Sequence, residues 1–287
     1  MAEARCPASC GELIQGWIAG SEKLISCPIN WFSTIEVTSG DARSSRERPL
    51  MRSALKLALQ SLNIPVTESQ GLKISFDSTI PVAKGMASST ADIAATITAT
   101  YRHFQSELSE QQLASLCARL EPSDSTVFRS LTLFDHKQGI VSAQYGQAGN
   151  LDILILESPQ QLSTAAYHRI DRRFHLVRSS EKLAEAAHYL AQSIHLKQAG
   201  RIGLATTVSA IESQQILPKP HFNDLLRLVE KHDLYGLNVA HSGTVVGLLY
   251  HSARQDIEAV LHDVRNSPIA HAYTQYHQCQ LISGGVR

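Results

Sequence analysis

The chain has 287 residues and equal numbers of acidic and basic side chains, so it lacks the basic excess that binding to nucleic-acid phosphates favours. Apolar residues make up 43% of the sequence, a share typical of globular proteins and not of disordered chains. No apolar run is long enough for a membrane span, and Met1–Arg5 does not begin a signal peptide. We therefore expect a cytoplasmic protein with neither a nucleic-acid nor a membrane partner.

The first half of the chain alternates the two-residue apolar period of strands with the longer period of helices. Ser109, with Gln112 three residues later, predicts a capping box at the start of one helix. The predicted elements are a strand at Thr34–Thr38, a helix at Leu50–Leu62, a strand at Leu72–Phe76, a helix from Ser88 or Ser89 to Phe104, a helix at Ser109–Leu120, and a hairpin of Leu131–Phe134 with Gly139–Ala143.

Residues 145–150 are rich in Gly, Gln and Asn, so they predict a linker between domains at 1–149 and 150–287. In the second half we expect strands at Leu151–Leu156, Val245–Tyr250 and Cys279–Ile282, and helices at Ser180–Ala199, Arg201–Gln214, His221–His232 and Asp256–Val264. The order strand, helices, strand, helix, strand suits a ferredoxin-like lobe.

The segment Pro81–Thr90 lies between a predicted strand and an alanine-rich helix. The helix begins near Ser88 or Ser89, because apolar residues recur four apart from Ile93 onward. Its free N–H groups and positive dipole end point into a loop with little side-chain bulk, the geometry of a phosphate cradle with hydroxyls available to magnesium. The alternative is local: one serine caps the helix, and Gly85 is a turn residue.

Two acidic residues directly follow the predicted helix Ser109–Leu120. Pro122 disfavours helical geometry at Glu121, so the helix ends there and Asp124 lies in a loop. Phosphoryl transfer from ATP requires magnesium and an aligned hydroxyl group. One carboxylate can bind the metal, and a second can orient or deprotonate the hydroxyl. The alternative is that Ser123 and Asp124 form an Asx-type turn that caps the next element.

Cysteines and histidines give no sign of a metal centre or a disulfide framework. The five cysteines are scattered and form no Cys-x-x-Cys pair, and the thirteen histidines include no His-Glu-x-x-His. We expect Cys6 and Cys10 to serve packing.

Three segments together resemble the signatures of the GHMP small-molecule kinases, such as galactokinase, homoserine kinase and mevalonate kinase. Pro81–Ser89 resembles the second signature, Pro-x-x-x-Gly-Leu-Gly-Ser-Ser. Cys6–Leu13 resembles a shortened first motif, with its Gly-Glu pair by the phosphoryl acceptor, and Leu237–Gly247 resembles the third, a small-residue turn that closes over the active site. Within the family, Pro-Ala-Ser-Cys-Gly-Glu-Leu-Ile-Gln-Gly, Glu-Pro-Ser-Asp-Ser and Asn-Val-Ala-His-Ser-Gly are most similar to members that phosphorylate L-threonine for cobalamin biosynthesis.

The resemblance implies an α+β fold with a ribosomal-S5-domain-2-like N-terminal lobe and a ferredoxin-like C-terminal lobe. It implies ATP between the lobes and Mg²⁺ held by Ser89 and Glu121, with Asp124 at the acceptor; these three are the expected catalytic residues. The expected ATP-binding residues are Pro81, Val82, Ala83, Lys84, Gly85, Met86, Ala87, Ser88, Ser89 and Thr90. The expected substrate-binding residues are Ser9, Cys10, Gly11, Glu12, His241, Ser242 and Gly243.

Two departures from the family pattern leave roles open. The segment between Glu121 and Asp124 is much shorter than in mevalonate kinase, so their roles could be exchanged or shared. Ser9 stands where mevalonate kinase has a lysine, which leaves Lys84 either to meet phosphate oxygens or to be solvated on the loop rim. Glu12 either binds the ammonium group of an amino-acid substrate or lies at the surface.

The sequence thus predicts an ATP- and magnesium-dependent kinase that converts L-threonine to O-phospho-L-threonine; a homodimer is left open. One alternative is another kinase of the superfamily, such as a homoserine kinase. The other is a non-catalytic GHMP-like regulator, which the joint presence of Ser89, Glu121 and Asp124 argues against.

Overall fold

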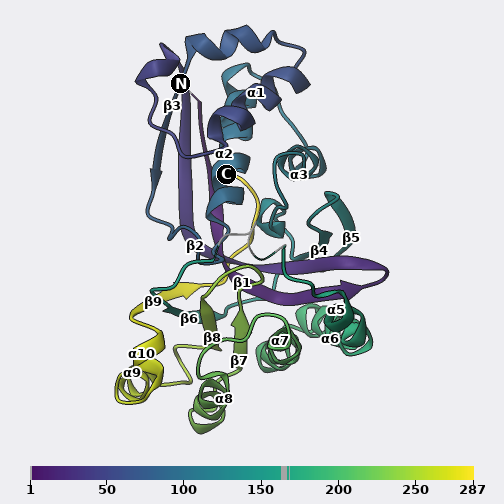
Figure 1. The fold of residues 1–287 in the computed structure, drawn as a ribbon, viewed down its shortest axis with the longest axis vertical. Coiled ribbons are helices and arrows are strands. Elements are labelled where there is room, and N and C mark those ends of the chain that lie inside the picture. Colours follow the sequence, from purple (N-terminus) through teal and green to yellow (C-terminus); the bar gives the residue numbers. More distant parts are fainter. Residues whose placement is uncertain (1, 163–166, 168) are drawn as a thin grey trace.

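Two long N-terminal strands, β1 (Ala2–Ile18) and β2 (Ser21–Ser39), form an antiparallel hairpin that runs through both halves of the molecule (Figure 1). The computed structural model describes residues 2–162, 167 and 169–287. The further strands in these residues are β3 (Leu72–Ser78), β4 (Thr132–Asp135), β5 (Ile140–Gln144), β6 (Asp152–Glu157), β7 (Gly236–Val239), β8 (Val246–Tyr250) and β9 (Gln275–Gln280). They join the hairpin in one sheet with the order β5-β4-β2-β1-β7-β8-β6-β9, and β3 pairs with β2.

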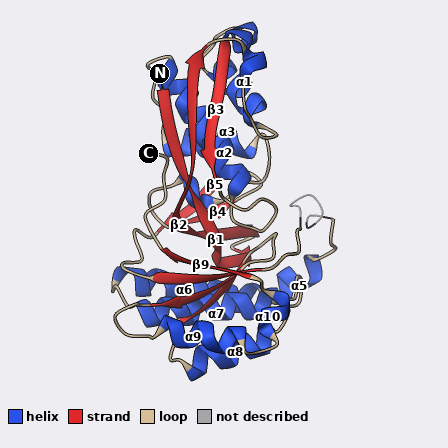
Figure 2. Ribbon diagram, turned by 90° about the vertical axis from the view of Figure 1, so that its left-hand side faces the viewer, coloured by secondary structure: helices blue, strands red, loops and turns tan. Residues whose placement is uncertain are grey.

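Two groups of helices cover this sheet (Figure 2). In the first group, α2 (Ser88–His103) packs on β1 and β2, and α1 (Met51–Ser61) and α3 (Glu110–Ala118) pack against α2. The second group lies under the strands of the second half and part of β1, and it includes α6 (Ser180–His195), α7 (Ala199–Ser213), α8 (Phe222–Lys231) and α9 (Ile257–Arg265). The short helices are α5 (Arg173–Arg178), α10 (Ile269–Ala272), η1 (Ala42–Ser44), η2 (Val66–Gly71) and η3 (Ser125–Val127).

Most of the predicted elements are confirmed, including α1, α2, β3, the β4–β5 hairpin and the capping box of Ser109 with Gln112 at α3. The predicted strand at Cys279–Ile282 is placed wrongly, because β9 runs over Gln275–Gln280 and pairs with β6. Strand β1, the first part of β2, β7 and α5 were not predicted. In β1, nearly all residues from Cys6 to Ile18 are buried, so the strand lacks the alternation that reveals a half-buried one.

The chain is mixed α+β, as expected, but its two halves are interleaved. Residues 145–150 form the expected loop between β5 and β6. Helices α6 and α7 of the second half pack against β1 of the first. The last residues return to the first half, where Ile282 N–H donates to the Pro28 carbonyl and Arg287 N–H to the Arg5 carbonyl. The division at 149 stays a prediction.

Cys6 and Cys10 are fully buried in the core, and burial raises the pKa of the Cys6 thiol to about 12. Their packing role is confirmed. None of the helices in the described part of the chain has the length and apolarity that crossing a bilayer requires.

Candidate active site

The first and third motifs meet where β1 leaves its regular ladder. The pairing of β1 with β2 shifts register repeatedly between Pro7 and Ile14. Within this stretch Gly11 has φ +54°, and a Cβ there would lie 2.6 Å from the Val239 carbonyl carbon. The close approach brings Glu12 opposite Val239, at the edge of the third motif.

The second motif turns into helix α2 without a side-chain cap. The N-cap residue is Ala87, in a left-handed conformation with φ 56°, and no side chain caps the helix. The capping interpretation of Ser88 and Ser89 is therefore wrong. Because these serines occupy the first turn of α2, their hydroxyls lie beside the uncapped N–H groups at the N-terminal end of the helix.

A cleft with an empty volume of about 1000 Å³ joins the three motifs and the two acidic residues after α3. The loop residues from Val82 to Thr90 line it, with the exception of Lys84. The other lining residues are Glu12, Leu24, Glu121, Pro122, Ser123, Asp124, His136, Leu162, His241 and Ser242. The cleft is the candidate active site, and most of the predicted site residues face it.

Glu121 pairs with Ser89 on one side of the cleft. Burial raises the pKa of Glu121, although a hydrogen bond from the Ser89 hydroxyl favours the ionised carboxylate. A hydroxyl and a carboxylate are hard oxygen ligands of the kind that Mg²⁺ prefers. These two side chains therefore fit the expected metal side.

Asp124 lies on the other side, next to Glu12. It stands at the N-cap of η3 but makes no capping bond with its side chain, so the Asx-turn interpretation is wrong. Instead Thr90 Oγ1 donates to Asp124 Oδ2 over 3.1 Å and accepts from the Asp124 N–H over 3.1 Å. Burial raises the pKa of Asp124 and of Glu12, and in Glu12 the neighbouring Asp124 charge raises it further. Glu12 is buried, so its surface alternative is wrong.

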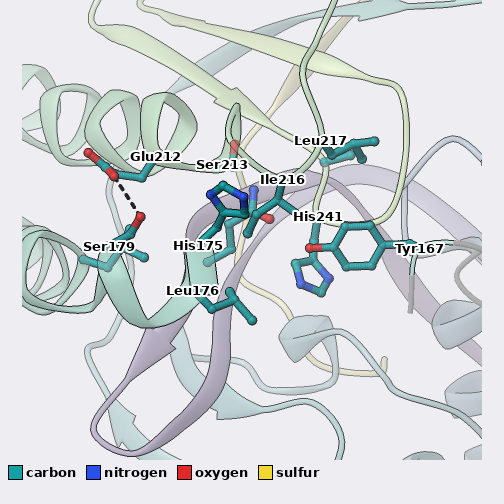
Figure 3. Close-up of a pocket in the computed structure, with 13 residues that line it drawn as sticks. Tyr167, His175, Leu176, Ser179, Glu212, Ser213, Ile216, Leu217 and His241 are labelled. Atoms are coloured by element: carbon teal, nitrogen blue, oxygen red, sulfur yellow. Dashed lines mark hydrogen bonds between the residues drawn. The ribbon is translucent and has the colours of Figure 1, made fainter. Parts of the chain in front are cut away.

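His241, from the third motif, adjoins this acidic pair. Its backbone favours the ionised form of Glu12, and its ring favours the ionised form of Asp124. The imidazole lies 4.6 Å from the Tyr167 ring and 5.0 Å from the His136 ring, measured between centroids. Figure 3 shows Tyr167 beside His241 at the edge of a second cavity, with an empty volume of about 360 Å³, that extends toward α5 and α7.

Glu22, His136 and His241 form a group, not predicted from the sequence, whose ligand atoms lie within 4.8 Å of one another. The Glu22 carboxylate already accepts hydrogen bonds from Arg172 and Lys137. Two cations on the same carboxylate oppose a divalent ion there, so this group is better described as an ion-pair cluster.

Lys84 is not among the residues that line the cleft. The structure therefore corrects both expectations for its side chain, contact with phosphate oxygens and solvation on the loop rim. Its ammonium donates to the carbonyls of Ser158 at 2.5 Å and Gln160 at 2.8 Å, and lies 3.7 Å from Glu157 Oε1. The residue is only 6% exposed, so it is neither a phosphate ligand nor a solvated rim side chain. It instead fixes the phosphate loop to the segment after β6.

Several other predicted site residues support the cleft without lining it. Pro81 does not reach the cleft, and Gly11 and Gly243 allow close backbone contacts. The Ser9 hydroxyl donates to the Gly11 carbonyl, and the Cys10 thiol to Asn238 Oδ1. Direct substrate contact by these side chains is thus not supported. The buried Lys219, which sequence reasoning missed, holds Gly243 through its carbonyl at 2.7 Å.

Gly85→Val is expected to separate the second and third motifs. Gly85 has φ +80°, and a Cβ there would lie 2.3 Å from Ala240 Cβ and 3.0 Å from Gly243 Cα. We expect a loss of about 1–3 kcal/mol in the free energy of unfolding from overpacking, together with a raised KM for ATP. Gly71→Val is the matched control, because a Cβ at Gly71 would meet no atom within 4 Å. Denaturant unfolding and ATP kinetics check this, and a fully stable Gly85→Val chain with native ATP KM would contradict it.

Comparisons with known proteins agree with this geometry. The family model described as the GHMP kinases N terminal domain matches residues 49–129. The L-threonine kinase of Citrobacter freundii is 49% identical over all of this chain and 99% of its own length. The L-threonine kinase of Salmonella typhimurium (strain LT2) is 47% identical over all of this chain and 95% of its own length.

Solved structures share the fold. A crystal structure of mevalonate kinase has a TM-score of 0.71 at 16% identity and covers 99% of this chain and 100% of that one. A crystal structure of homoserine kinase from Cytophaga hutchinsonii has a TM-score of 0.71 at 13% identity, and the match covers 100% of this chain and 96% of that one. The chain thus has the fold of these two kinases. From its full-length identity to the two relatives, the chain belongs to the GHMP kinase family.

Proposed function

We propose that this chain is an ATP-dependent L-threonine kinase, a phosphotransferase that makes O-phospho-L-threonine. The observation that carries the proposal is the identity of nearly half of the residues, over the full length, to two L-threonine kinases. The arrangement of the cleft supports the proposal, because the N-terminus of α2, the Ser89–Glu121 pair and the carboxyl groups of Glu12 and Asp124 all line the same cleft.

The nucleotide side is formed by the second motif. The uncapped N–H groups at the start of α2 would bind phosphate oxygens, and Ser89 with Glu121 would hold Mg²⁺. A bound Mg²⁺ neutralises charge that develops on the phosphates during transfer. Two observations support this role: Glu121 and Ser89 both line the cleft, and the Ser89 hydroxyl favours the ionised form of the Glu121 carboxylate.

The acceptor side is formed by Asp124, Glu12 and His241. The hydroxyl oxygen of the amino acid attacks the γ-phosphorus, its proton passes to Asp124, and ADP leaves. Glu12 Oε2 is buried and has no hydrogen-bond partner among the described residues, an arrangement that fits the ammonium group of an amino acid. The expected supply of the product to cobalamin biosynthesis stays a prediction.

The acceptor specificity follows from where the hydroxyl lies. Threonine and homoserine are isomers, so a shared clamp on the ammonium and carboxylate groups presents their hydroxyls at different distances. A misplacement of roughly 1 Å costs about a hundredfold in rate, and an apolar pocket discriminates the methyl group that serine lacks by about 10–200-fold. We expect kcat/KM to be highest for L-threonine, lower for L-serine, and very low for homoserine and D-threonine.

These values are measured by ADP release at saturating MgATP, with each amino acid varied in turn. A higher kcat/KM for homoserine than for L-threonine would assign the chain to homoserine phosphorylation instead. Absence of ADP release with every amino acid would contradict the threonine assignment and favour the regulator alternative.

A further inference from the structure

Glu22 is a buried carboxylate that joins three separate segments of the chain. It lies on β2 with its side chain 4% exposed. Arg172 grips both oxygens through Nε and Nη2 at 3.0 Å each, and Lys137 Nζ donates to Oε2 at 2.7 Å. His241 Nε2 lies 3.1 Å from Oε1. The partners come from the segment before α5, the β4–β5 turn and the third motif.

The contact with His241 serves both partners. Burial alone would raise the pKa of Glu22, but hydrogen bonds from His241, Arg172 and Lys137 hold it well below its usual range. The bond to Nε2 also fixes the direction of the imidazole ring, as carboxylates commonly do for functional histidines.

The same cluster holds the rings beside His241. The Arg172 guanidinium lies 4.6 Å from the centroid of the Tyr167 ring and donates to the Tyr167 carbonyl at 3.3 Å. Tyr167 in turn packs edge-on against His241, as Figure 3 shows for these two side chains. Glu22 therefore holds His241 directly through the ring nitrogen and indirectly through Arg172 and Tyr167.

The position of His241 matters on one side of the cleft. His241 lines the cleft together with Glu12 and Asp124, and its backbone and ring favour the ionised forms of these two carboxyl groups. The phosphate loop contacts the third motif elsewhere, through Thr244 N–H and Val245 N–H on the Lys84 carbonyl. A displaced imidazole would thus disturb the acceptor side more than the nucleotide side.

We propose that Glu22 is a positioning residue for the acceptor side of the cleft, which it sets by holding His241 and, through Arg172, Tyr167. This inference rests on the proposed kinase function. Glu22→Gln keeps the shape of the side chain but removes its charge. We expect kcat/KM for the amino acid to fall by about tenfold to a hundredfold, as for a catalytic geometry displaced by roughly 1 Å, while KM for MgATP stays within about twofold.

Lys137→Met is the matched control. It removes the half-exposed partner and leaves the bonds of Glu22 to Arg172 and His241, so its kinetics are expected to stay near those of the unaltered chain. The double variant Glu22→Leu with Arg172→Leu separates positioning from stability. Replacing a buried ion pair by apolar side chains is often neutral for folding, yet it leaves His241 without its carboxylate. We expect a folded chain whose acceptor kcat/KM remains lowered.

The assays use the hydroxyl amino acid that the unaltered chain phosphorylates fastest, with thermal unfolding measured for every variant. A Glu22→Gln chain with lowered thermal stability but native kinetics would assign Glu22 a structural role only. Equal losses for MgATP and the amino acid, or recovery of acceptor kinetics in the double variant, would also overturn the inference. An unaltered chain that phosphorylates no hydroxyl amino acid overturns the proposed function as well.

Discussion

Asp124→Asn is expected to lower kcat by about two orders of magnitude or more and to change KM for ATP little. The Asp124 side chain lines the cleft, as does Glu12, whose Oε2 has no hydrogen-bond partner among the described residues. The Asp124 carboxylate accepts a hydrogen bond from Thr90 and does not cap a helix. An amide keeps the hydrogen bond from Thr90 but accepts no proton. Asp77→Asn, at an exposed position of β3, is the control. A variant with native kcat would show that Asp124 is not the base.

The same residue predicts a pH dependence. Burial raises the pKa of both Asp124 and Glu12, so the pair binds a proton at a pH above the ordinary carboxyl range. Protonation removes the base, so as the pH is lowered kcat/KM should fall at a pH above the one at which ordinary carboxyl groups titrate. The acid limb should be lost in Asp124→Asn. An acid limb near the ordinary carboxyl pKa would contradict the coupled pair.

Ser89→Ala and Glu121→Gln are each expected to lower kcat by about 10²–10³-fold and to raise the magnesium concentration needed for half-maximal rate. The two side chains meet at the start of α2, and losing either ligand weakens the charge stabilisation that the metal supplies. Ser106→Ala, beyond the far end of α2, is the control because, within the described residues, its hydroxyl bonds only to the Phe104 carbonyl.

Magnesium titrations of these variants also decide between the two acids. If Asp124→Asn raises the magnesium requirement steeply and Glu121→Gln does not, the roles of Glu121 and Asp124 are exchanged. Native magnesium dependence in both Ser89→Ala and Glu121→Gln would remove this pair from the metal site.

The segments that form the cleft could be predicted from the sequence where a short run of residues carries the pattern. The loop before α2, the acids after α3 and the small-residue turn near His241 were all recognised from short patterns, and all contribute to the cleft. Local patterns did not predict the surroundings of side chains whose contacts come from distant segments of the chain. The burial of Lys84 depends on carbonyls that follow β6, and Ser9 is covered within the β1–β2 hairpin.

The Glu22 cluster shows the same limit more sharply. Its bonds to Arg172 and His241 join residues separated by 150 and 219 positions. A lone glutamate after a turn carries no signal of such partners. Its role becomes visible only when the β1–β2 hairpin passes beneath the third motif.

Phosphorus NMR of the chain with ATP, Mg²⁺ and L-threonine tests the central claim most directly. In O-phospho-L-threonine the carbon that bears the phosphate carries one hydrogen, so the new phosphomonoester signal should be a doublet when proton coupling is retained. It should grow as the γ-phosphate signal of ATP declines and ADP signals appear. Inorganic phosphate as the only new phosphorus species beside ADP would contradict the assignment of this chain as an L-threonine kinase.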